Sequence, residues 1–252
     1  MSRIDTIFSG DKKALMPFLV AGYPTIESTE EAIIAMDEAG ADIIEIGIPF
    51  SDPIADGPVI AAAMHQALQK GVTPAHAIGV VSRIRDRVSA GLVAMVSESI
   101  VHRSGGSVFL DRLVEAGFDG VIIPDIDDLD AENMSAYCSG CGLTFSMLVS
   151  PTTPPNRIEW LASISTGFLY VLARVGLTGE QAALPDITKR IAEIRALTNL
   201  PLAVGFGIST REHVESVTQT ADAAIVGSAL VRRMSTTDNP AAAARDFVRE
   251  LS

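Results

Sequence analysis

Eight short apolar runs recur along the chain, and segments with a helical pattern separate them. In the intervening segments, such as residues 187–199 (ITKRIAEIRALTN), apolar residues stand three or four positions apart, which is the spacing of an amphipathic helix. Strands that are apolar on both faces and alternate with helices are typical of a parallel sheet covered by helices. Eight such units in a chain of 252 residues predict a (β/α)₈ barrel. The expected strands are residues 14–22, 42–48, 91–97, 120–125, 143–150, 167–173, 200–207 and 223–229.

The main alternative to a barrel is an open, doubly wound parallel sheet. That fold usually carries a G-x-G-x-x-G turn after its first strand, and no such turn follows residues 14–22. No linker rich in proline or serine separates two halves of the chain. Residues 1–252 are therefore expected to form one domain, which is long enough to bury a sizeable core.

The charge balance limits the possible partners. The chain has 31 acidic and 19 basic residues, a net charge of −12, whereas a nucleic-acid binder usually presents a basic face. No apolar run reaches the length of about 18 residues that a membrane-spanning helix needs. The first residues, MSRIDTIFSGDKK, do not resemble a signal peptide. We expect no nucleic-acid partner, no membrane span and a cytoplasmic location.

The cysteines and histidines offer little for a metal site. Cys138 and Cys141 form a C-x-x-C motif that could be a redox pair or half of a metal site, but no second pair completes four ligands. The motif also ends a helical pattern, so we favour two structural thiols. His102 is expected in a loop after the third strand, without a role. The other histidines are expected on helix surfaces, namely His65, His76 and His213.

A carboxylate interrupts the second apolar run, IIEIG. Side chains alternate across a strand, so Ile43, Glu45 and Gly47 share one face and the isoleucines between them share the other. The all-isoleucine face suits packing against helices, which turns Glu45 into the barrel. Burial there would raise the pKa of Glu45 towards the range of an acid–base catalyst. The alternative is a structural ion pair, for which only Arg174 is in a suitable place.

Asp56 lies in the loop that follows this strand. Pro49, Pro53 and Pro58 restrict the loop, and Gly57 permits a tight turn. An aspartate before glycine is often only a turn former. The residues themselves leave Asp56 undecided between a turn former and a functional group.

Glycines stand at the ends of the last three predicted strands. They occur in Thr178-Gly179, in residues 205–209 (GFGIS) and in Gly227-Ser228. Backbone N–H groups of such loops, near a helix N-terminus, bind phosphate without lysine or arginine. Phosphate sites after strands seven and eight are frequent in barrels, so we favour this function over glycines that merely end strands.

Five motifs resemble the tryptophan synthase alpha chain family. They are EIGIPFSDPIADGP, MPFLVAGYP, VGLTG, VGFGIS and IVGSALV, and the resemblance runs in register from about residue 3 to residue 235. It implies a (β/α)₈ barrel that cleaves indole-3-glycerol phosphate to indole and glyceraldehyde 3-phosphate in tryptophan biosynthesis. It also implies a beta-chain partner in an alpha2beta2 assembly. No cofactor is expected on this chain, and pyridoxal phosphate is expected only on the beta chain.

The resemblance also assigns roles to single residues. Glu45 would be the general acid–base, and Asp56 would handle the indole N–H group. Thr178 would close onto Asp56, and Arg174 would steady that loop. The indole pocket would be lined by Phe18, Ile122 and Tyr170, and the phosphate would be held by Gly179, Phe206, Gly207, Gly227 and Ser228.

Some segments depart from the family pattern. After the third strand, where the family has an aromatic residue and then Asn-Pro, this chain has Ser97, Ser99 and Ile100. After ADGP it has Ala61 and Gln66 in place of the usual glutamine and arginine, and Asp127 stands where proline is common. The first two segments meet the beta chain in the family. A lyase that works alone and releases indole, or a catalytically weak regulatory subunit, therefore remain the alternatives to an ordinary alpha chain.

Overall fold

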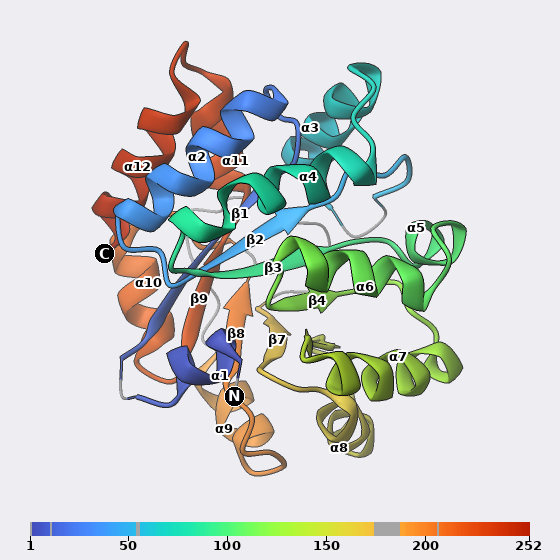
Figure 1. Cartoon of the computed structure of the whole chain (residues 1–252). Helices are drawn as coiled ribbons and strands as arrows, with labels where there is room; N and C mark the ends of the chain where they lie inside the picture. Colours follow the sequence, from blue (N-terminus) through green and yellow to red (C-terminus); the bar gives the residue numbers. More distant parts are fainter. Residues whose placement is uncertain (1, 11, 54–55, 174–186, 206) are drawn as a thin grey trace.

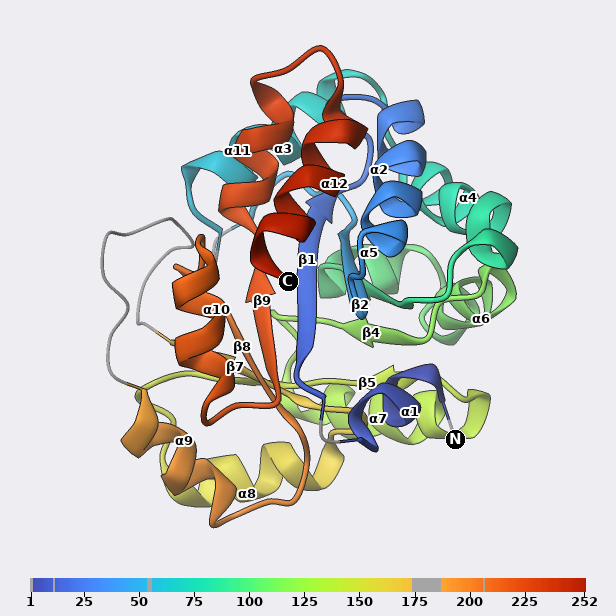
Figure 2. The same cartoon turned by 90° about the vertical axis from the view of Figure 1, so that its left-hand side faces the viewer.

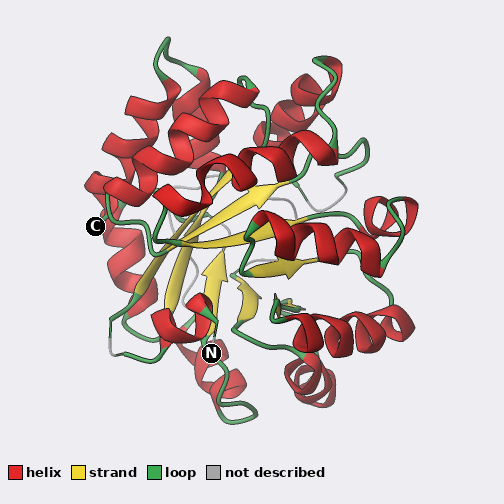
Figure 3. Ribbon diagram, viewed as in Figure 1, coloured by secondary structure: helices red, strands yellow, loops and turns green. Residues whose placement is uncertain are grey.

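The strands of the chain run parallel and curl into a barrel that helices surround (Figures 1 and 3). The computed structural model describes residues 2–10, 12–53, 56–173, 187–205 and 207–252. In these residues the sheet has the order β5-β4-β3-β2-β1-β9-β8-β7-β6. The strands are β1 (Ala14–Val20), β2 (Ile43–Gly47), β3 (Gly91–Met95), β4 (Gly120–Ile122), β5 (Thr144–Phe145), β6 (Leu148–Val149), β7 (Leu169–Leu172), β8 (Leu202–Gly205) and β9 (Ala223–Val226).

The expected fifth strand, residues 143–150, is divided into two short strands. Its first half, β5, pairs with β4, and its second half, β6, pairs with β7. Between the halves, the N–H group of Ser146 donates to Val121 and that of Tyr170 donates to the carbonyl of Met147. One extended segment thus bonds to both ends of the sheet and closes the ring. The predicted barrel is confirmed, but the prediction of an unbroken fifth strand was wrong.

The helices form the outer layer. They are α1 (Arg3–Phe8), α2 (Ile26–Glu38), α3 (Pro58–Gln69), α4 (Pro74–Ile84), the 3₁₀ helix η1 (Arg85–Arg87), α5 (Glu98–Arg103), α6 (Ser107–Ala116), α7 (Asp128–Cys141), α8 (Pro155–Ile164), α9 (Thr188–Arg195), α10 (Arg211–Thr218), α11 (Ser228–Ser235) and α12 (Pro240–Leu251). The last helix, α12, packs against both α2 and α11 and so joins the two ends of the outer layer (Figure 2). No helix in the described ranges is long and apolar enough to cross a membrane.

Local sequence signals set several helix ends. Thr25 caps α2 through a capping box with Ser28, because each side chain accepts a hydrogen bond from the backbone N–H group of the other residue. Gly117 and Gly142 end α6 and α7 in the left-handed conformation that glycine adopts without a steric penalty. His102 lies within α5, so the expectation of a loop at this position was wrong.

The two faces of β2 belong to different parts of the core. Ile44, Ile46 and Ile48 pack between the sheet and the helices, whereas Ile43 packs inside the barrel. This is the division of faces that the alternation of residues 43–48 predicted.

The two cysteines are free thiols at the C-terminal end of α7. Burial raises the pKa of Cys138 to about 12, and the thiol of Cys141 donates to the carbonyl of Cys138. A thiol with so high a pKa is protonated and unreactive near neutral pH. The structure therefore agrees with two structural thiols.

Candidate active site

Glu45 projects from β2 near its C-terminal end. In the register of the sheet it lies beside Phe18 of β1 and Val93 of β3. Its side chain is completely buried, and neither carboxyl oxygen has a hydrogen-bond partner among the described residues. Burial, and in addition the nearby charge of Asp56, raise the pKa of Glu45 to about 8. Glu45 is therefore mostly protonated at neutral pH and can donate a proton.

Asp56 reaches the same region from the loop between β2 and α3. Its backbone N–H group donates to the carbonyl of Pro53 at 3.0 Å, which is a turn contact. Its side chain is half-buried, and burial raises its pKa to about 6. Near pH 7 the pair thus holds one proton, chiefly on Glu45, and Asp56 remains chiefly ionised. The sequence left Asp56 undecided between a turn former and a functional group. In the structure its backbone forms a turn contact, and its side chain is a carboxyl group with a raised pKa.

Two aromatic rings line the barrel interior near these carboxyl groups. A Cβ atom placed on Gly47 would lie 2.6 Å from the ring of Phe18, and one placed on Gly205 would lie 2.6 Å from the hydroxyl of Tyr170. Glycine at both positions therefore makes room for the rings. Tyr170 is buried, and its pKa is raised by burial and by the charges of Glu45 and Asp56, so its hydroxyl stays protonated.

Ile122 completes the apolar side of this region. It is completely buried, lies in register beside Met95, and belongs with Tyr170 to the cluster of side chains inside the barrel. Of the three residues assigned to the indole pocket, Ile122 and Tyr170 thus share one cluster, and Phe18 belongs to a second cluster; Met95 packs against both.

Gly47 and Gly205 were not assigned a function from the sequence. The signal that could have found them is the alternation along β2 and β8, which turns each glycine towards the barrel interior at a strand end. A glycine on the inward face next to a predicted aromatic wall leaves space that any side chain would fill.

The N-terminus of α11 offers backbone groups to an anion. Gly227 is its N-cap residue and no side chain caps the helix, so the first N–H groups have no side-chain acceptor there. Ser228, the first residue of α11, is largely buried. A Cβ atom on Gly227 would lie 3.4 Å from the ring of Phe18, so this helix end adjoins the aromatic wall.

Gly207 follows β8 and has a φ of +86°. Only glycine adopts this backbone conformation without strain, so the loop after β8 requires glycine at this position. Four of the predicted site residues lie outside the described residues, namely Arg174, Thr178, Gly179 and Phe206.

Comparison with known proteins agrees with this geometry. The family model for the tryptophan synthase alpha chain matches residues 5–251. The chain belongs to the tryptophan synthase alpha chain family. It is accordingly a lyase of tryptophan biosynthesis, in a family whose members cleave indole-3-glycerol phosphate and work with a beta chain. The predicted family, fold and activity are confirmed.

Individual relatives are similar over nearly the whole chain. The tryptophan synthase alpha chain of Prochlorococcus marinus is 40% identical over 235 residues, which cover 92% of this chain and 86% of the relative. That of Chloroflexus aurantiacus is 40% identical over 259 residues, which cover 100% and 97%. A structure of Mycobacterium tuberculosis tryptophan synthase has a TM-score of 0.91 at 32% identity and covers 99% of this chain and 96% of its own. The structure of a mutant tryptophan synthase alpha-subunit from Pyrococcus furiosus has a TM-score of 0.88 at 32% identity, and the match covers 94% of this chain and 97% of that subunit.

Proposed function

We propose that Glu45 and Asp56 are the catalytic residues with which this chain cleaves indole-3-glycerol phosphate. The observation that carries the proposal is the pair formed by the buried carboxyl group of Glu45 and the half-buried one of Asp56, with pKa values of about 8 and about 6. Two carboxyl groups whose surroundings separate their pKa values can act as acid and as charged base at the same pH. Such perturbed groups concentrate at functional sites.

The proposed reaction uses Glu45 twice, first as a proton donor and then as a proton acceptor. The protonated Glu45 donates its proton to C3 of the indole ring, and the Asp56 carboxylate stabilises the positive charge that develops on the indole N–H group. The Glu45 carboxylate then accepts the proton of the side-chain hydroxyl group. The bond between C3 and the side chain breaks, its electron pair returns to the indole ring, and the hydroxyl carbon becomes the aldehyde of glyceraldehyde 3-phosphate. Glu45 ends protonated, as it began.

The remaining predicted residues would bind the two ends of the substrate. Phe18, Ile122 and Tyr170 supply an apolar wall for the indole ring. The N-terminus of α11 at Gly227 and Ser228 supplies N–H groups for the phosphate, together with the loop at Gly207 and the predicted contacts of Gly179 and Phe206. In the same scheme Thr178 closes onto Asp56 and Arg174 steadies its loop.

The carbon–carbon bond cleavage is redox-neutral and needs only proton transfers, so we propose that this chain needs no cofactor and that pyridoxal phosphate belongs to the beta chain. The proposed assembly is alpha2beta2, formed in the cytoplasm, with residues 1–252 folded as one domain and without nucleic-acid or membrane partners.

The altered contact segments support a second candidate, a lyase that releases indole on its own. In these segments the Ser97 hydroxyl donates to Asp125 at 2.7 Å, which fixes the residue inside the protein.

The test is indole release by Glu45→Gln and Asp56→Asn variants. Each should lower kcat by at least about 10², the usual contribution of a positioned acid–base group, and should leave the fold and the affinity for glycerol phosphate unchanged. Asp52→Asn is the matched control, because Asp52 is an exposed carboxylate in the same loop. Activity of Glu45→Gln within a few-fold of the parent would remove Glu45 from the mechanism. Adding a beta chain to the parent distinguishes the coupled enzyme from the independent lyase.

A further inference from the structure

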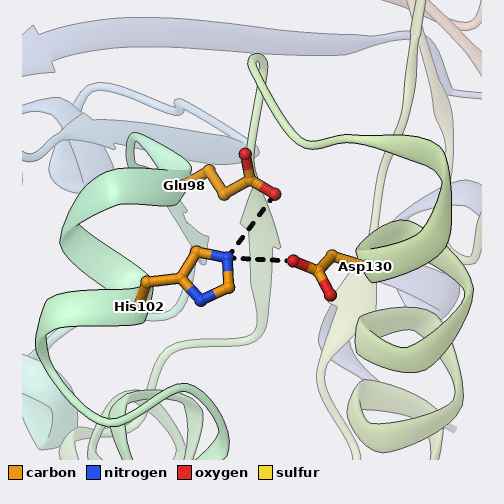
Figure 4. A group of neighbouring side chains, drawn as sticks. All are labelled: Glu98, His102 and Asp130. Carbon is orange, nitrogen blue, oxygen red and sulfur yellow. Dashed lines mark ion pairs between the residues drawn. The ribbon is translucent and has the colours of Figure 1, made fainter.

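Three side chains from two helices converge on one point outside the candidate active site (Figure 4). Glu98 and His102 project from α5, and Asp130 projects from α7. Nε2 of His102 lies 2.9 Å from Oδ2 of Asp130 and 3.7 Å from Oε1 of Glu98. Within the described part of the chain, this is the one group of three or more such residues whose ligand atoms all lie within 4.8 Å of one another.

Local hydrogen bonds hold Glu98 in place, and the geometry of α5 puts His102 beside it. Glu98 and His102 are four residues apart, so they share one face of α5. The backbone N–H group of Asp127 donates to Oε1 of Glu98 at 3.2 Å, which ties this carboxylate to the start of α7. The backbone N–H group of Glu98 in turn donates to Asp125 at 2.8 Å. Hydrogen bonds of this kind orient the ligands of a metal ion before it binds.

The spacing of the ligand atoms fits one small ion. Zinc binds imidazole nitrogen and carboxylate oxygen at about 2.0–2.2 Å, which puts two ligand atoms of a tetrahedral site about 3.4 Å apart. The observed separations of 2.9 Å and 3.7 Å lie on either side of this value. The third separation, between the carboxylate oxygens of Glu98 and Asp130, is within 4.8 Å, so adjustments of side chains that solvent reaches would bring all three atoms into coordination.

The charges around the group favour a cation. Asp125 and Asp127 precede α7 and Asp128 begins it, and Arg103 is the basic residue next to His102 in the sequence. Arg157 is already paired with Asp128. The side chains of His102, Asp130 and Glu98 are 53%, 33% and 21% exposed, so an ion can reach them from solvent.

We propose that Glu98, His102 and Asp130 form a binding site for a divalent transition-metal ion of the zinc class. An imidazole with two carboxylates suits such an ion better than magnesium or calcium, which prefer oxygen ligands alone. Three protein ligands leave the remaining coordination positions to water. The bound ion joins α5, which follows β3, to α7, which follows β4, and so stabilises two connections at the end of the barrel that carries Glu45. The site is independent of the proposed catalytic roles.

The alternative to a metal site is an ion pair of His102 with the two carboxylates, and metal titration separates the two. Calorimetric titration with Zn²⁺ at pH 7.5 should show one site, and Co²⁺ should give the visible absorption of a coordinated ion. His102→Gln, Glu98→Gln and Asp130→Asn should each weaken Zn²⁺ binding by at least about tenfold. All titrations are repeated with Cys141→Ser, because the half-buried thiol of Cys141 is a competing ligand.

His65→Gln is the matched control, because His65 is an exposed histidine on α3, away from the group. His65→Gln should bind Zn²⁺ as tightly as the parent does. Zn²⁺ should raise the melting temperature of the parent and of His65→Gln, but not that of His102→Gln. Absence of Zn²⁺ binding, or binding that survives all three substitutions, would overturn the proposal. So would a site that takes Mg²⁺ or Ca²⁺ in preference to Zn²⁺. These measurements need no catalytic assay, so they stand apart from the test of Glu45 and Asp56.

Discussion

Glu45 and Asp56 form an interacting pair of carboxyl groups: burial raises the pKa of Glu45 to about 8, and the negative charge of Asp56 adds to the rise. Burial alone raises the pKa of Asp56 to about 6. Between these two values the pair holds a single proton, and the apparent pKa values belong to the pair rather than to either residue. The single-proton state is the one that the proposed reaction requires.

We first predict a bell-shaped dependence of kcat/KM on pH. The rate constant should rise as the pair loses its first proton near pH 6 and fall as it loses its second near pH 8, because kcat/KM reports the ionisations of the free enzyme. The phosphate of the substrate also titrates near pH 6. The pH dependence of glycerol phosphate binding therefore serves as the control for the acidic limb. A profile that stays level from pH 6 to pH 9 would contradict the assignment.

The second prediction concerns stability. The pKa of Glu45 rises from the ordinary value of 4.5 to about 8 on folding, and that of Asp56 rises from 3.8 to about 6. At pH values between the ordinary and the folded pKa of each group, the native state therefore binds more protons than the unfolded state. The free energy of unfolding should then fall as pH rises. Both groups contribute to the fall up to about pH 6, and Glu45 alone contributes from there up to about pH 8. The slope is at most about 1.4 kcal/mol per pH unit for each proton.

Urea unfolding at pH 6 and at pH 8 measures this effect. Glu45→Gln carries no ionisable group at position 45, so it should lose less stability than the parent over this interval. Glu31→Gln, at an exposed position of α2, should behave as the parent. An equal loss in all three proteins would show that Glu45 does not cause the pH dependence.

Phe18 and Gly47 provide the third prediction. Gly47→Ala places a Cβ atom 2.6 Å from the Phe18 ring and should cost about 1–3 kcal/mol of stability, because the ring must move within a packed core. Phe18→Leu removes the ring atoms that the new methyl group meets. The double variant should therefore be more stable than the sum of the two single effects predicts, as measured by urea unfolding. Strict additivity would show that the two residues do not interact.

Gly207 and Gly40 provide the fourth prediction. Both have a left-handed backbone, with φ of +86° and +101°, so alanine at either position should cost about 1–2 kcal/mol of stability. A Cβ atom at Gly40 would meet nothing within 4 Å, and Gly40 is exposed. Only Gly207→Ala should also weaken glycerol phosphate binding, by about tenfold, which equals about 1.4 kcal/mol. Equal affinity of the two variants, measured by calorimetry, would place the phosphate elsewhere.

The last prediction concerns the beta chain. Where the family pattern has an aromatic residue and Asn-Pro, this chain turns Ser97 inward to Asp125 and leaves Ser99 exposed. Loss of a rigid proline raises the entropy cost of ordering a segment on binding. We expect tight binding to the chain's own beta chain and weak binding to one whose alpha partner keeps Asn-Pro. Calorimetric titration with both beta chains decides this, and tight, activating binding to the second would show that the substitutions have no effect.

The sequence by itself determined the features that depend on local periodicity. The alternation of apolar runs with helical patterns predicted the barrel, and the alternation within residues 43–48 predicted which way Glu45 points. These inferences succeed because the period of a strand or helix is a property of the backbone, so neighbouring residues reveal it. The specific residue roles came from family motifs instead, and periodicity alone left Asp56 undecided.

Only the tertiary structure decided which distant residues meet. Residues 143–150 divide into β5 and β6 because the first half pairs with β4 and the second half pairs with β7. No local sequence pattern predicts this division. The contact of His102 with Asp130 joins residues on two helices that follow separate strands. The rise in the pKa of Glu45 comes first from its burial inside the barrel and then from the charge of Asp56, and both depend on tertiary packing. Burial and charge act through space, and sequence patterns describe order along the chain.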